Sequence, residues 1–378
     1  MNVGFWKLLT FAVMLSLVAS IGAKEEPRFK TKKPLVQVAI LLDTSNSMDG
    51  LIGQAKSQLW KIVNEFIRAR QDGEMPEVQV ALFEYGNNGL SAQQGWIRKV
   101  SDFTTDLDFI SEKLFALRTD GGEEYCGWVI QDALDRLEWS PSSCAYKAIF
   151  IAGNEPFTQG PVDYTDSCKS AAARGILVNT IFCGDEREGV DTMWRDGARL
   201  AGGKFLIINQ DCAATYIEAP QDKEIAKLSS DLNETYLGYG RTGAESSVRQ
   251  QMQDRNAATV ASSGALVARA VAKSSANYYN ANWDLVDAAK DKDFKLEALK
   301  ESDLPVAMQT LPPGERKEFI EKKSQERAEL QAKINALNAE REKFVAARMK
   351  AVAKTNTLDS AIINTVREQA RTREFKFE

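Results

Sequence analysis

One short stretch, residues 36–48, constrains the fold of this chain more than any other. It begins with VQVAILL, in which every residue except Gln37 is apolar, and this run is long enough for a strand and too short for a typical helix. A run of this kind, with no polar alternation at its end, is typical of a central strand buried on both faces of a parallel sheet. The stretch therefore predicts an α/β sheet with this strand near its middle.

Three side chains that carry oxygen follow at the end of this strand. Asp43, Ser45 and Ser47 occupy alternate positions, and a carboxylate with two hydroxyls can converge on a hard cation such as Mg²⁺ or Ca²⁺. Open α/β sheets usually bind ligands at the carboxyl ends of their strands. The alternative interpretation is a helix cap, in which these side chains accept N–H bonds from the first turn of the next helix.

Strand and helix patterns alternate through the rest of this region, which predicts a doubly wound, mostly parallel sheet flanked by helices. Helical spacing of apolar residues recurs over 51–67, 107–117, 129–137 and 193–200. Apolar runs of strand length lie at 78–83, 96–100, 146–151, 176–182 and 205–208. The turn between the first two of these runs predicts a hairpin at the edge of the sheet.

No convincing strand follows residue 237, so residues 237–378 are expected to form an all-α C-terminal region. The composition predicts one long helix over 241–273, and an aromatic interruption at 278–287 is expected to dock on the sheet. Pro312-Pro313 opens a helix of about 40 residues, and 361–371 predicts a last short helix. The apolar stripe of the long helix fits either a helical hairpin within the chain or an intermolecular coiled coil.

The N-terminal segment predicts export. Residues 1–23 combine Lys7, an apolar core and a zone of small residues, as in a cleaved signal peptide, and 24–33 is a charged linker. We therefore expect an extracytoplasmic protein, periplasmic or secreted, with no integral membrane segment in the mature chain. Five cysteines follow. A disulfide among Cys126, Cys168 and Cys183 and buried free thiols are both open.

Charge and composition exclude several functions. The formal net charge is −5, whereas a general nucleic-acid binder usually presents a basic face. The chain has no histidine, which removes Ser-His-Asp catalysis and every zinc site with a histidine ligand. The missing histidine argues against an enzyme without excluding one, and we predict a protein that is not an enzyme.

Residues 34–236 resemble the von Willebrand factor type A (VWA) family, whose metal-ion-dependent adhesion site (MIDAS) opens with Asp-x-Ser-x-Ser. Here that motif is intact. The family's second loop supplies a threonine, and this chain has Glu124 at the matching position. Its third loop supplies an aspartate, and this chain has Gly153 there, followed by Asn154. The resemblance thus implies a degenerate adhesion site, and the short signal with the absence of histidine indicates a bacterial extracytoplasmic member of the family.

The resemblance also implies a function and a set of site residues. A divalent cation, Mg²⁺ ahead of Ca²⁺ or Mn²⁺, would assist protein binding, with a partner carboxylate completing its coordination. The expected metal ligands are Asp43, Ser45, Ser47 and Glu124, and the expected partner-binding residues are Glu123, Tyr125, Glu155, Phe157 and Asp185. The alternative is an envelope scaffold that acts through its helical C-terminal region with no metal bound.

Overall fold

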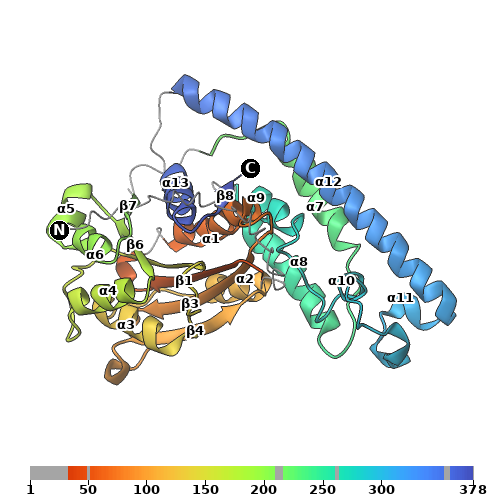
Figure 1. Ribbon diagram of the computed structural model, residues 1–378, viewed down its shortest axis with the longest axis horizontal. Coiled ribbons are helices and arrows are strands. Elements are labelled where there is room, and N and C mark those ends of the chain that lie inside the picture. The colour runs from red at the N-terminus through yellow and green to blue at the C-terminus, as the bar shows by residue number, and fades with distance from the viewer. Residues whose placement is uncertain (1–32, 49–51, 209–215, 260–263, 353–357, 378) are drawn as a thin grey trace, which may run out of the picture. The chain divides into compact units, whose positions relative to one another are not determined.

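A six-stranded sheet organises the computed structural model (Figure 1). The structure describes residues 33–48, 52–208, 216–259, 264–352 and 358–377. The strand order is β4-β3-β1-β5-β6-β7. The strands are β1 (Leu35–Asp43), β3 (Glu77–Tyr85), β4 (Ile97–Thr104), β5 (Tyr146–Gly153), β6 (Leu177–Cys183) and β7 (Phe205–Ile208). Only β4, at one edge, pairs antiparallel in this sheet. The predicted doubly wound, mostly parallel sheet and its edge hairpin are confirmed.

The first strand is central because both of its faces are apolar. Val36, Val38 and Leu42 pack into the core on one face of the sheet. Ala39 and Leu41 pack into the core on the other face. Successive side chains of a strand point to opposite faces, so the apolar run from Val38 to Leu42 places β1 between two helical layers.

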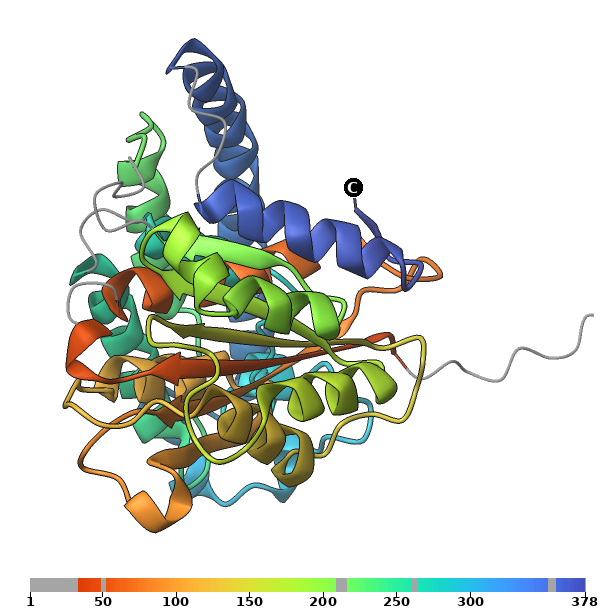
Figure 2. The same cartoon turned by 90° about the vertical axis from the view of Figure 1, so that its left-hand side faces the viewer.

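Helices cover both faces of the sheet, as Figures 1 and 2 show. On one face lie α1 (Ile52–Ile67) and α13 (Leu358–Arg371), and on the other lie α3 (Cys126–Arg136) and α4 (Tyr164–Ala173). The other short elements of this region are α2 (Leu107–Ala116), α5 (Glu186–Asp191), α6 (Trp194–Leu200), the 3-10 turns η1 (Asn46–Met48) and η2 (Ala92–Gln94), and a two-stranded pairing of β2 (Ala69–Arg70) with β8 (Lys376–Phe377).

After β7, the described part of the chain adds helices and no strand to the main sheet. These elements are α7 (Asp222–Asn233), α8 (Gly243–Thr259), α9 (Ala265–Lys273), α10 (Leu285–Ala288), α11 (Val306–Gln309), α12 (Pro313–Val352), η3 (Leu296–Ala298) and η4 (Glu301–Asp303). The single helix predicted over 241–273 is wrong, because α8 and α9 are separate. Gly264 precedes α9 with a φ of 58°, a left-handed conformation that an α-helix interior does not contain.

The 40-residue helix α12 is confirmed, and it packs mainly along α7 (Figure 1). Its buried side chains form a narrow stripe, with Ile320, Arg327 and Ile334 spaced seven residues apart. The last helix, α13, packs on α1 and β7. Within the described part of the chain, α7 is therefore the main helix that covers the buried stripe of α12.

A buried cluster of ion pairs connects the helices that follow β7 with α2, which packs on the sheet. Arg269 on α9 is fully buried and donates to Asp108 of α2 over 2.6 Å and to Asp254 of α8 over 2.5 Å. Lys273 also binds Asp254, at 2.8 Å. The Tyr278 hydroxyl donates to Asp108, so the aromatic segment docks on α2 as expected.

Two of the sequence predictions concern export and the cysteines. The signal peptide over 1–23 and Cys212 lie outside the described residues. Among the cysteines that the structure describes, Cys126, Cys144, Cys168 and Cys183 are free thiols. None of the described helices is both long and apolar enough to cross a membrane.

Candidate functional site

The Asp-x-Ser-x-Ser motif folds into a tight turn at the carboxyl end of β1. The backbone N–H of Ser45 donates to Asp43 Oδ1 over 2.7 Å, which turns the chain back toward the carboxylate. The hydroxyl oxygens of Ser45 and Ser47 lie 2.7 Å apart. Ser47 Oγ donates to Asn154 Oδ1 over 2.8 Å, so the loop after β5 joins the same cluster.

Glu124 reaches this cluster from the loop before α3. Its carboxyl group interacts with the Ser45 hydroxyl and with Asp43. The approach is close because Gly86, with a φ of 77°, lies between the two acids. A Cβ atom on Gly86 would lie 2.8 Å from both Asp43 Oδ1 and Glu124 Cγ. The structure therefore brings all four expected metal ligands together.

The two carboxyl groups are electrostatically unsatisfied. Burial, with a smaller contribution from the Glu155 carboxylate, raises the pKa of Asp43 to about 7. Burial, followed by repulsion from Asp43 and Glu155, raises the pKa of Glu124 to about 8. Asp43 is fully buried, and its Oδ2 atom has no hydrogen-bond partner among the described residues. An unpaired buried carboxylate oxygen is costly.

These residues fit a hard cation. A divalent ion would neutralise two carboxylates that repel each other and would accept the unpaired Asp43 oxygen as a ligand. No group of three or more Cys, Asp or Glu side chains suited to a metal occurs in the described parts of the chain. A cation would therefore depend on Asp43, Glu124 and the two serine hydroxyls, with Asn154 as a neighbour.

Tyr85 explains why the third loop has a glycine. A Cβ atom on Gly153 would lie 2.5 Å from the Tyr85 hydroxyl oxygen and 3.2 Å from Asp43 Oδ2. Tyr85 fills that space and donates to the Ala152 carbonyl over 2.9 Å. Sequence reasoning missed Tyr85, because the motif does not include it and no local pattern places it beside the site.

The expected partner-binding residues do not all lie at the surface. Glu123 and Asp185 are exposed, and Glu155 is half-buried. Asp185 caps α5 by accepting from the backbone N–H of Arg187 over 2.8 Å. Phe157 is fully buried against Trp194, so its side chain is part of the core and cannot contact a partner in this structure.

Tyr125 belongs to an aromatic group beside Glu124. Its ring meets Trp96 edge-on with the centroids 5.4 Å apart, and stacks on Trp128 at 6.2 Å. Trp96 has a φ of 51°, which is unusual for a bulky residue, and its carbonyl accepts from the Gly86 N–H over 3.1 Å. Sequence reasoning missed Trp96, although the glycine-rich turn before it was a signal for an unusual backbone.

Comparisons with known proteins return structures alone. No protein-family model matches the chain, and no curated protein matches it. BatB from Bacteroides thetaiotaomicron is 17% identical over 46% of this chain and 90% of its own, with a TM-score of 0.35. The SpRpn10 VWA domain is 15% identical over 47% and 89%, with a TM-score of 0.36.

A third similar structure is proximal thread matrix protein 1 from the mussel byssus, whose structure has a zinc-occupied MIDAS motif. It is 17% identical over 47% of this chain and 43% of its own, with a TM-score of 0.35. At these TM-scores the likenesses carry no argument about the function of this chain. The proposed function rests on the site residues and on the observed sheet.

Proposed function

We propose that this chain is a non-enzymatic protein-binding module whose binding is assisted by a divalent cation. The cation would be held by Asp43, Ser45, Ser47 and Glu124, with Mg²⁺ favoured over Ca²⁺ or Mn²⁺. The observation that carries the proposal is the unpaired Asp43 Oδ2 atom, which is buried beside a second acid at the carboxyl end of the central strand.

The cation would supply a coordination position for a partner. Two protein carboxylates leave a divalent ion short of its usual six or more oxygen ligands, so water or a carboxylate from another protein can complete the shell. Ser47 is exposed, which leaves one side of the site open to such a partner. An Asp or Glu side chain of the partner is the ligand that this arrangement would favour.

The surface around the site would add specificity. Tyr125 directly follows Glu124 in the chain, and the Glu155 carboxylate acts on both Asp43 and Glu124. The exposed acids Glu123 and Asp185 would favour basic groups beside the partner's carboxylate. The Trp96 and Tyr125 rings would offer an apolar and π-rich contact. Phe157 is left out of this surface because it is buried.

We also propose that the protein has no catalytic activity and that it lies outside the cytoplasm. The chain has no histidine to act as a general base for a serine, and a two-metal hydrolase would need more carboxylates than this site holds. The sequence over 1–23, with its basic start, apolar core and small-residue zone, supports the extracytoplasmic location.

A scaffold that acts through the helical region is the competing function. The large exposed surface of α12 favours this scaffold function. In the part of α12 whose side chains the structure describes, four side chains are buried: Ile320, Arg327, Ile334 and Asn338. A partner that still binds after Asp43→Asn, and no longer binds after charge reversals on the exposed side of α12, would favour the scaffold over the adhesion module.

Metal content tests the proposed site directly. We expect equilibrium dialysis against Mg²⁺ or Mn²⁺, followed by elemental analysis, to give one ion per chain. Asp43→Asn should abolish this binding, whereas Asp185→Asn should leave it unchanged because Asp185 is an exposed helix cap. Binding of the same amount by the Asp43→Asn variant, or no binding by the unaltered protein, would contradict the proposal.

A further inference from the structure

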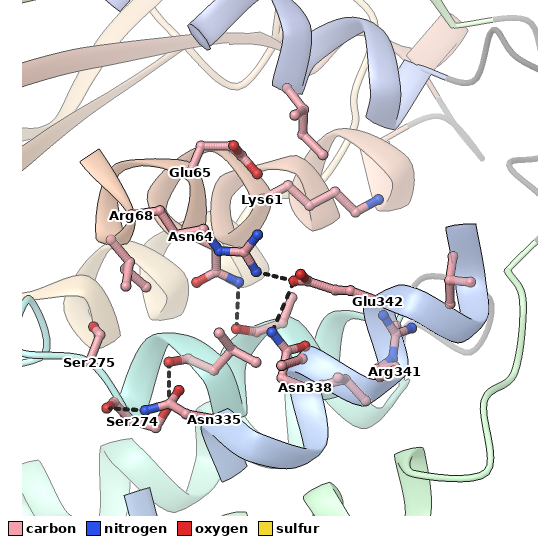
Figure 3. Close-up of a pocket in the computed structure, with 18 of the residues that line it drawn as sticks. Lys61, Asn64, Glu65, Arg68, Ser274, Ser275, Asn335, Asn338, Arg341 and Glu342 are labelled. Atoms are coloured by element: carbon pink, nitrogen blue, oxygen red, sulfur yellow. Dashed lines mark hydrogen bonds and ion pairs between the residues drawn. The ribbon is translucent and has the colours of Figure 1, made fainter. Parts of the chain in front are cut away.

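A second candidate site lies at the far end of α1, where a cavity of about 990 Å³ opens. Residues of α1, α9, α12 and α13 line it, and Figure 3 shows side chains from α1 and α12 meeting across it. None of the proposed metal ligands lines this cavity. Its volume is at the upper end of the range of about 300–1,000 Å³ that is usual for small-molecule sites.

The lining has an excess of positive charge. Its basic side chains are Lys61, Arg68, Arg70, Arg341 and Arg367, and its acidic side chains are Glu65 and Glu342. Arg341 is already paired with Asp222, just outside the lining, at 2.6 Å, so the formal excess that remains is two positive charges. A cavity with such an excess attracts an anion.

The arginines are positioned by carboxylates that do not exhaust their donors. Arg367 Nε donates to Glu65 Oε2 over 2.7 Å, and Arg68 pairs with Glu342 across the cavity (Figure 3). A guanidinium carries five N–H donors, more than one carboxylate accepts. Burial raises the pKa of the Glu65 carboxyl group, and the Arg367 guanidinium opposes that rise.

The rest of the lining includes apolar side chains and one unsatisfied acceptor. Val267 and Val271 of α9 and Ile363 of α13 line the cavity. Asn64 donates through Nδ2 to the Ala268 carbonyl over 2.8 Å. Its Oδ1 atom is buried and has no hydrogen-bond partner among the described residues. A ligand that donates an N–H to this oxygen would satisfy it.

We propose that this cavity binds an amphipathic organic carboxylate that carries an amide N–H close to its acid group, as in an N-acyl amino acid. The carboxylate binds the guanidinium groups of Arg68 and Arg367. The amide N–H donates to Asn64 Oδ1, and the acyl chain packs against Val267 and Val271. This site is separate from the metal site, so either proposal can fail without the other.

Isothermal titration with N-decanoylglycine, below its micelle concentration, tests the proposal. The uncharged methyl ester of the same compound is the matched probe, because it keeps the acyl chain and the amide and lacks the negative charge. We expect the acid to bind at least tenfold more tightly than the ester. Absence of binding by the acid, or equal binding of the two probes, overturns the proposal without reference to any variant.

Two variants locate the binding. Glu65→Gln with Arg367→Met removes an ion pair without leaving a buried charge alone, and should weaken binding of the acid at least tenfold. The control is Lys204→Met with Glu368→Gln, a surface pair that also involves α13 and lies outside the lining. This control should leave binding unchanged.

Ala268→Phe should fill the cavity and abolish binding. Unchanged binding in the Glu65/Arg367 and Ala268 variants overturns the assignment, provided that circular dichroism shows them folded.

Discussion

Asp43 and Glu124 are two buried acids whose charged forms the protein disfavours in the absence of a cation. Their pKa values rise to about 7 and about 8 in the folded protein, from ordinary values near 4. The folded state therefore binds protons more tightly than the unfolded state does. The resulting stability is fully present below pH 4 and is lost as the pH rises through 7 to 8.

We predict that the protein in EDTA gains stability when the pH falls from 8 to 5. An increase of one in a pKa corresponds to about 1.4 kcal/mol, so the gain should reach a few kcal/mol even after allowance for solvent at the open side of the site. No histidine titrates in this window. Chemical denaturation at each pH measures the effect.

The control for this pH dependence is the double variant Asp43→Asn with Glu124→Gln, which lacks both titrating groups. Its stability should change much less between pH 8 and pH 5. An equal pH dependence in the double variant and the unaltered protein would show that other groups are responsible.

Gly86 leaves room for both acids of the site because it has no Cβ atom. We predict that Gly86→Ala destabilises the fold and abolishes metal binding, because the added carbon would lie 2.8 Å from Asp43 Oδ1 and from Glu124 Cγ. Gly73 is the matched control, since it also has a positive φ, 81°, but nothing within 4 Å of the added atom. Gly73→Ala should cost about 1–2 kcal/mol for the left-handed backbone alone and leave metal binding intact. Equal losses would contradict this account.

At the scale of elements, Arg327 fastens α12 to the rest of the helical region. Its Nη1 atom lies 2.7 Å from Asp284 Oδ2 and 3.2 Å from Asp287 Oδ1, and its guanidinium stacks 3.9 Å from the Tyr236 ring centroid. Arg327 is almost fully buried. The ion pair therefore sets where α12 sits along α10.

We predict that Arg327→Met destabilises the protein by about 3–5 kcal/mol, because it leaves the buried Asp284 without a cationic partner, whereas Asp287 keeps its ion pair with Lys290. Arg348→Met, at an exposed position of the same helix, should change stability by no more than about 0.5 kcal/mol. Urea denaturation measures both changes. Similar small effects for the two variants would mean that Arg327 does not anchor α12.

The elements that the sequence predicts well are those with one dominant local signal. The apolar run before Asp43 predicts β1, and the start of α12 at Pro313 follows from its two prolines. The division into α8 and α9 was missed because Ala, Gln and Arg favour helix throughout the segment. A single left-handed glycine at 264 is a weak signal against that propensity.

The site was predictable only in part, for a similar reason. Asp43, Ser45 and Ser47 lie close in sequence, so their turn can be inferred from spacing. Tyr85 and Trp96 come from a neighbouring strand and its hairpin, and their approach depends on how tightly the strands pack. The burial of Phe157 depends on Trp194, 37 positions later in the chain, and no local pattern reveals that contact.

At the scale of the whole molecule, residues 33–378 form one compact unit. The buried cluster of Arg269, Asp108 and Asp254 crosses from the helical region to α2. We predict that the sheet and helical regions unfold together, with coincident transitions in far-ultraviolet and near-ultraviolet circular dichroism. Two separated transitions would show that the cluster does not couple the regions.

The central claim is that the site at the end of β1 is built for a cation. The most direct test is a thermal melt at pH 7.5 in EDTA and in excess Mg²⁺, Ca²⁺ or Mn²⁺, repeated with Asp43→Asn. An ion at about 100 times its dissociation constant should stabilise the fold by about 2.7 kcal/mol. We predict a rise of a few degrees in Tm that the variant lacks. No shift with any ion, or an equal shift in the variant, would mean that these side chains serve only as a helix cap.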